Sequence, residues 1–336
     1  MKYYAGLDVS LKDTFISIID ERGKVVKEGS VGSDVTSLSA YLKQQAFEYE
    51  LVGIESGQLS ISLCKGLLKK GLKVICVDAR HMAAALSARI NKNDRNDARG
   101  IAQMLRAGLY KEVKIKSDES CQVKMLLGGR RQLVTTRQQL MGTIRGLLKI
   151  YGIRVGSQTK FAEQVREAID KLDEMSCLSM EALLEGLAGI EKALKTLDKK
   201  LEEIGRKDED CSRLMTVPGV GVITALTYKV ALDNPGRFET SETVGAYFGL
   251  TPRQYASGET DRHGSISKMG PKECRTMLYE AAQTLLTRVK KKGSLKNWGL
   301  KIAKKKGFKK AAVAVARKLA VIMHRMLVDK KEFCYQ

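Results

Sequence analysis

Four acidic residues of this 336-residue chain stand where their side chains could converge and hold metal ions. Asp8 and Glu55 each end a short apolar run typical of a buried strand, so each carboxylate should lie at an edge of the sheet. Asp94 and Asp97 begin a predicted helix, and a spacing of three places them on one helical face. Converging carboxylates repel one another unless cations lie among them, and oxygen-only ligands favour Mg²⁺ or Mn²⁺. Two such ions, about 3.5–4 Å apart, can activate a nucleophile and stabilise the leaving oxygen in phosphodiester cleavage.

Each acid taken singly has a simpler explanation. An aspartate at the end of a strand is commonly a turn residue, and one at the start of a helix commonly caps it or favours its N-terminus. The combination of all four, in this order and on a basic chain, favours the metal site.

The elements that would position these acids alternate between strands and helices, which predicts an α/β domain. Three hairpin-linked antiparallel strands open the chain, and strand–helix repeats follow. The predicted elements are strands at 3–9, 15–19 and 24–31, a helix through Val35, Leu38 and Leu42, a strand at 51–55, a helix over 61–70 and a strand at 72–77. This is the order of a ribonuclease-H-like sheet, and also of each half of an actin-like ATPase.

The middle of the chain predicts two long helices. Apolar residues spaced alternately by four and three run from Leu183 to Ile204, and a second helical face runs from Leu126 to Tyr151. Joined near residues 152–160, the two helices predict an antiparallel coiled-coil arm. The arm would serve either as an internal hairpin or for self-association.

A turn-rich, mainly helical domain is predicted to begin near Cys211, because all four prolines lie between Pro218 and Pro271. Gly219 and Gly221 allow a tight turn of the helix-hairpin-helix kind, whose amides at the next helix N-terminus could bind a phosphate. A plain turn is the alternative. The predicted domains are therefore residues 1–117, 118–208 and 209–336.

The net charge of +21 is concentrated at the C-terminal end. Residues 288–336 hold 16 Lys and Arg against two acidic residues, a net charge of +14. The lysine clusters are Lys290, Lys291 and Lys292; Lys304, Lys305 and Lys306; and Lys309 and Lys310. A solvated helical face is the simpler interpretation, but an excess this large favours a nucleic acid partner. Aromatic residues make up only 6%, which argues against base stacking as the main binding mode.

Several classes of protein are disfavoured by composition. The best candidate for a membrane span, residues 311–323, is interrupted by Arg317 and Lys318, and the N-terminus has no signal-like leader. Seven scattered cysteines without a CxxC pair argue against zinc and for a reducing compartment. We expect a cytoplasmic, nucleoid-associated protein of a bacterium or archaeon, with no membrane partner.

Two sets of motifs resemble one known family. The first set is Gly-Leu-Asp8-Val-Ser, Gly-Ile-Glu55-Ser and Lys92-Asn-Asp94-Arg-Asn-Asp97-Ala, which resembles the DEDD signature of insertion-sequence transposases related to Piv-type DNA invertases. The second is Val217-Pro-Gly-Val-Gly, the segment from Ala246 to Gly258, and Ile266-Ser-Lys-Met-Gly270, which resembles that family's C-terminal transposase domain. The resemblance spans most of the chain, in order.

This resemblance implies a RuvC-like domain that binds divalent metal through the four acids, and a serine that attacks the DNA backbone to give a phosphoserine intermediate. Ser257 is the serine carried over, although relatives often have two adjacent serines where this chain has Ala256 and Ser257. Ser265 and Ser267 are rivals, and a Ser-Gly turn is the structural alternative. The family is also similar to RNA-guided recombinases, which implies a structured bridge RNA that pairs with double-stranded donor and target DNA.

A serine hydroxyl is a weak nucleophile and needs a metal or a base to activate it. Arg253, Arg262 and Lys268 could stabilise charge on the scissile phosphate. His263 is close enough in sequence to be a base, but a surface or phosphate-contacting role is the preferred interpretation.

The resulting prediction is a DNA recombinase that cuts and rejoins DNA and assembles as a homo-oligomer, a dimer or a tetramer. Three alternatives remain open at this point: a ribonuclease-H-like junction nuclease that uses water, an actin-like ATPase suggested by Gly6-Leu-Asp8-Val, and a nucleic-acid-binding protein without catalysis.

Overall fold

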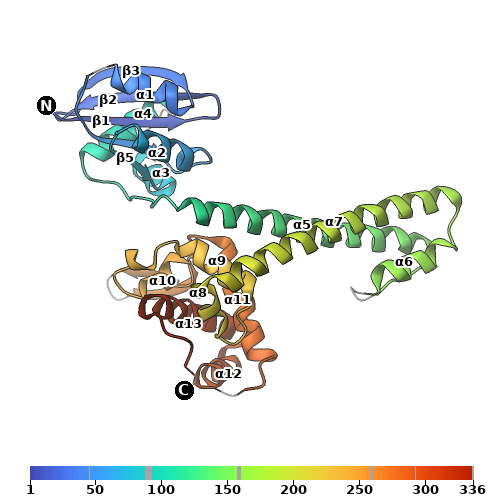
Figure 1. Cartoon of the computed structure of the whole chain (residues 1–336). Helices are drawn as coiled ribbons and strands as arrows, with labels where there is room; N and C mark the ends of the chain where they lie inside the picture. Colours follow the sequence, from blue (N-terminus) through green and yellow to red (C-terminus); the bar gives the residue numbers. More distant parts are fainter. Residues whose placement is uncertain (45, 88–92, 157–159, 258–259, 292, 335–336) are drawn as a thin grey trace. The chain divides into compact units, whose positions relative to one another are not determined.

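The chain divides into two compact units, Met1–Lys116 and Ser117–Gln336 (Figure 1). The structure is a computed structural model that describes residues 1–44, 46–87, 93–156, 160–257, 260–291 and 293–334. Each unit is described by itself.

The first unit is built on a five-stranded mixed sheet with the order β3-β2-β1-β4-β5. Its strands are β1 (Tyr3–Val9), β2 (Asp13–Asp20), β3 (Val25–Gly32), β4 (Tyr49–Glu55) and β5 (Val74–Val77). The first three strands pair antiparallel, whereas β4 pairs parallel to β1 and β5 parallel to β4. The predicted ribonuclease-H-like α/β order is confirmed.

Helices cover both faces of this sheet. They are α1 (Val35–Lys43), α2 (Ser60–Lys69), α3 (Ala79–Leu86) and α4 (Asp94–Arg106). Ala5 and Leu7 of β1 belong to one core with Leu38 of α1 and Leu67 of α2. Because side chains alternate along a strand, Gly6 and Asp8 belong to the opposite face, and α4 packs there.

The second unit begins with a long helical arm. Its elements are α5 (Asp118–Leu148), the short 3₁₀ helix η1 (Lys149–Tyr151), α6 (Phe161–Ile169) and α7 (Glu174–Lys207). The end of α5 packs on the start of α7 through Leu148 and Leu184. The start of α5 lies in one core with Leu201 near the end of α7, so the two long helices run antiparallel (Figure 1). The predicted seam faces α5 within the same chain, and the helix α6 was not predicted.

The rest of the second unit is mainly helical. Its elements are α8 (Glu209–Met215), α9 (Val222–Leu232), η2 (Pro235–Arg237), α10 (Thr243–Tyr247), β6 (Pro252–Ser257), β7 (Thr260–Ile266), α11 (Lys272–Thr287), α12 (Ser294–Lys306) and α13 (Phe308–Asp329). The apolar face of α13 enters the core, where Val315, Leu319 and Met323 are fully buried. Among the helices of the described residues, none combines the length and apolar character needed to cross a bilayer.

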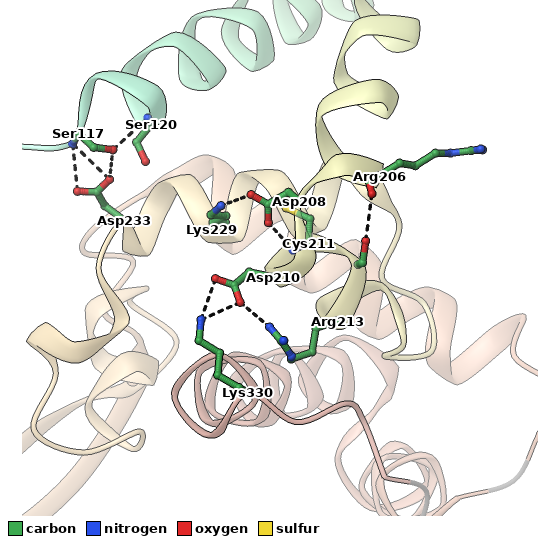
Figure 2. Close-up of polar contacts among 11 residues, drawn as sticks. Ser117, Ser120, Arg206, Asp208, Asp210, Cys211, Arg213, Lys229, Asp233 and Lys330 are labelled. Carbon is green, nitrogen blue, oxygen red and sulfur yellow. Dashed lines mark hydrogen bonds and ion pairs between the residues drawn. The ribbon is translucent and has the colours of Figure 1, made fainter.

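Polar contacts secure the base of the arm within the second unit (Figure 2). Ser117, the N-cap of α5, donates its hydroxyl to Asp233 Oδ1 at 2.7 Å. Asp208, the N-cap of α8, pairs with Lys229 of α9 and accepts the amide of Cys211 at 2.8 Å. Asp210 accepts Lys330 Nζ at 3.0 Å just beyond α13. The first two contacts attach the start of α5 and the end of α7 to α9, and the third links α8 to the residue after α13.

Candidate active site

Asp8 and Glu55 lie side by side at the carboxyl ends of two adjacent parallel strands. Leu7 of β1 is in register with Ile54 of β4, and each acid follows by one residue. Both acids are half-buried and line one depression of about 370 Å³. The strands that carry Asp8 and Glu55 are therefore neighbours in the sheet, which the predicted convergence of the two carboxylates requires.

Serines around this depression are engaged in turns. Ser10 donates its hydroxyl to the carbonyl of Asp13 at 2.7 Å, and Ser60 donates to that of Gly57 at 2.8 Å. The hydroxyl of Ser56 accepts the amide of Ala79 at 3.1 Å. The two carboxylates are thus the anionic groups of the lining, and an oxygen-only donor set of this kind suits a hard divalent cation.

Helix α4 carries Asp94 and Asp97 in its first turn, towards the same end of the sheet. Its C-terminal part lies at the other end, where Gln103 Nε2 donates to the carbonyl of Gly23 in the β2–β3 turn at 2.7 Å. The N-terminus of α4 is capped by Asn93, whose side chain accepts the amide of Asn96 at 2.8 Å. The helix therefore runs opposite to β1 and begins near the end of the strand that bears Asp8.

Two glycines let α4 approach the strands that bear Asp8 and Glu55. A Cβ on Gly6 would lie 2.1 Å from the carbonyl oxygen of Ala98, and a Cβ on Gly53 would lie 2.7 Å from Leu105 Cδ1. Asp8 and Glu55 are two residues beyond these glycines, so they occupy the same face of the sheet.

Asp94 is exposed and Asp97 is half-buried. Over the described ranges of the chain, no group of three or more His, Cys, Asp or Glu side chains is arranged to hold a metal ion. The structure thus brings Asp8 and Glu55 together and places Asp94 and Asp97 on the adjoining helix, and ligation by all four stays a prediction.

In the second unit, Ser257 ends strand β6 and is exposed. It lies on a two-stranded antiparallel hairpin, an element that the sequence did not predict, in which Tyr255 is opposite Arg262. Alternation along β6 puts Arg253, Tyr255 and Ser257 on one face, and cross-strand pairing adds Arg262 to it. An exposed hydroxyl and two guanidinium groups therefore share one face of the hairpin.

The rival serines are placed differently. Ser265 is exposed and lies in β7 three residues beyond Arg262, where the pairing with β6 shifts register. Ser267 lies beyond β7, donates its amide to the carbonyl of Thr251 at 2.8 Å, and is half-buried. Lys268 is exposed, with a left-handed φ of 55°, and donates its amide to the carbonyl of Gly249 at 3.1 Å.

Arg275 of α11 joins the two loops at the base of this hairpin, a role that was not predicted from the sequence. Its Nη1 donates to the carbonyl of Phe248 at 3.0 Å and to that of Met269 at 3.2 Å. The loops touch backbone to backbone, because a Cβ on Gly249 would lie 2.2 Å from the carbonyl oxygen of Met269. No local pattern could reveal Arg275, since one of its partners is 27 residues away.

The turn between α8 and α9 has the predicted hairpin form. Gly219 has a φ of +89°, and its α carbon faces the backbone of α11, where a Cβ would lie 2.6 Å from the carbonyl oxygen of Ala281. Gly221 is the N-cap of α9 and is exposed, with open space where a side chain would be. Gly219 thus serves close packing, whereas Gly221 leaves the start of α9 accessible.

The C-terminal lysines are exposed wherever the structure describes them. They are Lys290 and Lys291 after α11, Lys304, Lys305 and Lys306 at the end of α12, and Lys309 and Lys310 at the start of α13. Lys292 lies outside the described residues. Lys309 and Lys310 lie at the N-terminus of α13, where the positive end of the helix dipole disfavours cations. The first turn contains no acidic residue to offset this, so an external anion would be stabilising there.

Two family models match the chain. The N-terminal transposase model with the DEDD signature matches residues 5–153, and the model described as "Transposase IS116/IS110/IS902 family" matches residues 211–296. The first range includes all four predicted acids, and the second includes Ser257 and the hairpin. Domains of the DEDD class generally use divalent metal ions.

Curated relatives agree with these matches. The transposase for insertion sequence element IS1111A of Coxiella burnetii is 30% identical over 98% of this chain and 90% of its own length. The transposase for insertion sequence element IS1328 of Yersinia enterocolitica is 26% identical over 69% of this chain and 70% of its own. The pilin gene-inverting protein of Moraxella bovis is 28% identical over 36% of this chain and 38% of its own. The predicted family is confirmed: this chain belongs to the IS116/IS110/IS902 family of transposases, enzymes that act on DNA.

Proposed function

We propose that this transposase cuts and rejoins donor and target DNA with divalent-metal-binding carboxylates and a serine nucleophile. The observation that carries the proposal is the placement of Asp8 and Glu55 on one depression at the ends of adjacent strands, with the turn that bears Asp94 and Asp97 on the helix packed across those strands. These four residues would hold Mg²⁺ or Mn²⁺, which supplies Lewis-acid stabilisation of a phosphodiester oxygen.

Ser257 is the proposed nucleophile, supported by its exposure and by the guanidinium groups on its face of the hairpin. Its Oγ bonds to phosphorus as the bond from phosphorus to the leaving deoxyribose oxygen breaks, and the serine proton is passed on to that oxygen. Arg253 and Arg262 neutralise the charge that develops on the non-bridging oxygens. A deoxyribose hydroxyl of another strand then reverses the reaction and releases Ser257, so rejoining consumes no external energy.

The exposed lysines at the ends of α12 and α13 are proposed to contact nucleic acid backbone. Their partner includes a structured bridge RNA, whose pairing with DNA would select sequence without base contacts from the protein. Arg253, Arg262, Lys268 and the accessible amides at Gly221 are the proposed phosphate contacts nearer the hairpin.

We further propose that the three predicted segments divide the work, with the acids in 1–117, the arm in 118–208, and the serine and lysines in 209–336. Recombination of two duplexes requires several subunits, so the working form is proposed to be a homodimer or homotetramer. Its proposed site of action is the nucleoid in the cytoplasm of a bacterial or archaeal cell.

Trapping of a covalent protein–DNA adduct tests the proposal. The protein is purified from its host with any copurifying RNA, incubated with Mg²⁺ and end-labelled element DNA that is nicked beside the cleavage site, and denatured. We expect labelled protein from the wild type and from Ser265→Ala and Ser267→Ala, and none from Ser257→Ala or Asp8→Asn. Cleavage without any adduct would favour a water-using nuclease, and an adduct formed by Ser257→Ala would reassign the nucleophile. A discrete RNA in the purified sample supports the bridge-RNA part separately.

A further inference from the structure

Four residues form a row across the sheet beneath α4. Gly53 of β4 is in register with Gly6 of β1, Gly6 with Ser17 of β2, and Ser17 with Glu28 of β3. The glycines at one end of the row give the helix room, because their missing side chains are replaced by the backbone of α4 and the side chains of Ile101 and Leu105. The other end of the row is polar and meets α4 through ionic contacts.

Glu28 binds two arginines of α4. Arg95 Nε donates to Glu28 Oε2 at 2.7 Å, Arg99 Nη2 donates to the same oxygen at 2.8 Å, and Arg99 Nε bonds Oε1. Ser17 Oγ donates to Oε1 at 3.1 Å. The Glu28 side chain is only 10% exposed, and a carboxylate buried to this extent is tolerated because charged donors satisfy it.

These contacts act on the turn that carries the acids. Ala98 is the first buried residue of α4, so the turn before it has little apolar attachment to the sheet. At 100° per residue, Arg95 and Arg99 lie on the side of the helix towards β3, whereas Asp94 and Asp97 share the side of Ile101, which contacts Gly53. The rotation of α4 about its own axis therefore decides whether the two aspartates face the ends of β1 and β4.

We propose that Glu28 is a positioning residue for the acidic site, and that through Arg95 and Arg99 it fixes the rotation of α4 that turns Asp94 and Asp97 towards Asp8 and Glu55. The inference rests on the proposed function in its use of the two aspartates as metal ligands. Glu28 itself binds no metal ion and touches no substrate in this role.

Mn²⁺ binding to the full chain, followed by the electron paramagnetic resonance signal of the free ion, tests this role. We expect Glu28→Gln to raise the Mn²⁺ concentration for half-occupancy about tenfold, the usual effect of losing an outer-shell support. The half-saturating Mn²⁺ for DNA cleavage should rise equally, with the rate at saturating Mn²⁺ within about twofold of wild type. The matched control is Glu50→Gln, which breaks the 3.1 Å ion pair with Lys2 at the opposite end of β4 and should leave both values unchanged.

A double-mutant cycle separates positioning from a general field effect. If Glu28 acts through Arg99, the double variant with Glu28→Gln and Arg99→Gln should have a Mn²⁺ affinity no lower than that of the weaker-binding single variant. If Glu28 merely adds negative charge, removal of the positive charge at Arg99 should restore the affinity, and that result overturns the proposal. Arg95→Gln, which leaves the Arg99 contacts intact, should give a smaller shift of about threefold and serves if Glu28→Gln does not fold.

The same titration distinguishes failure of the inference from failure of the proposed function. Wild-type Mn²⁺ affinity in Glu28→Gln, together with loss of binding in Asp97→Asn, overturns the role of Glu28 and leaves the metal site standing. Wild-type affinity in Asp97→Asn overturns both.

Discussion

Gly6 of β1 and Ala98 of α4 are in direct contact, and no side chain fits between them. A Cβ on Gly6 would lie 2.1 Å from the carbonyl oxygen of Ala98 and 2.5 Å from the amide nitrogen of Ala102. Both neighbours are helix backbone, which cannot move aside as the end of a flexible side chain can.

Gly6→Ala should therefore lift α4 from the sheet and destabilise the first unit by more than about 3 kcal/mol, towards the upper end of single-residue effects. Calorimetric unfolding of the full chain measures the change. Gly142→Ala is the matched control, because its Cβ position on α5 has no described atom within 4 Å beyond the local helix backbone, and alanine is favoured over glycine in a helix. A Gly6→Ala protein that unfolds like the wild type would contradict the close contact.

Acid should weaken the attachment of α4 through Glu28. The hydrogen bond from Arg99 lowers the pKa of Glu28 from its ordinary 4.5 to about 2, against the opposing effect of burial and with help from Arg95 and Ser17. A carboxylate with a lowered pKa stabilises the fold above its unfolded pKa, and this stabilisation is lost as the pH falls from 4.5 towards 2. The melting temperature of wild type should exceed that of Glu28→Gln at neutral pH, and the difference should vanish across this window. A difference that persists at about pH 2 would contradict the ionic origin of the contact.

Removal of two buried tyrosine hydroxyls should affect the free energy of unfolding differently. Tyr228 Oη donates to the carbonyl of Ala320 at 2.5 Å, whereas the buried Tyr41 Oη has no hydrogen-bond partner among the described residues. Tyr228→Phe should lose about 1 kcal/mol of unfolding free energy, and Tyr41→Phe should be neutral or stabilising, because an unsatisfied buried hydroxyl is unfavourable. Urea denaturation of both variants gives the comparison. Equal losses in the two variants would be inconsistent with these contacts.

Arg275 should matter for the reaction at Ser257 without contacting it. Arg275→Ala removes the donor that joins the carbonyls of Phe248 and Met269 at the base of the hairpin. A small displacement of a reacting group can lower the rate about 10- to 100-fold, so adduct formation should slow by this order. Arg288→Ala, at the exposed C-cap of the same helix, is the control and should react normally. Normal adduct formation by Arg275→Ala would show that the loops keep their positions without it.

The lysines at the end of α12 should contribute to salt-dependent binding of nucleic acid. Each phosphate contact contributes about −0.9 to the slope of log affinity against log salt, so Lys304→Gln, Lys305→Gln and Lys306→Gln together should flatten the slope by about 2 to 3. Affinities measured by filter binding at several salt concentrations test this. The equally exposed Lys192, Lys195 and Lys199 of α7, changed to glutamine, should leave the slope unchanged. An equal effect of both triple variants would indicate general charge attraction only.

Local patterns predicted most of the first unit. The apolar runs that lead to Asp8 and Glu55 were predicted as strands at 3–9 and 51–55, and the structure has strands at Tyr3–Val9 and Tyr49–Glu55. Burial of an apolar segment is encoded in the segment itself. The seam from Leu183 to Ile204 likewise predicted α7, although only packing against α5 showed where it faces. The hairpin that bears Ser257 escaped prediction, since its strands, PRQYAS and TDRHGSI, are mostly polar and show no apolar alternation.

The sequence by itself determined the order of strands and helices, the concentration of charge at the C-terminal end, and the motifs of an IS110-type transposase. Only the tertiary structure decided that β1 and β4 are neighbours, that α4 runs back across them, and that Glu28 receives Arg95 and Arg99 from 67 and 71 residues away. Hydrophobic periodicity records which face of an element is buried, but not which partner buries it. The contacts that would orient the acidic residues are made between such partners, so they emerge only when the chain is folded.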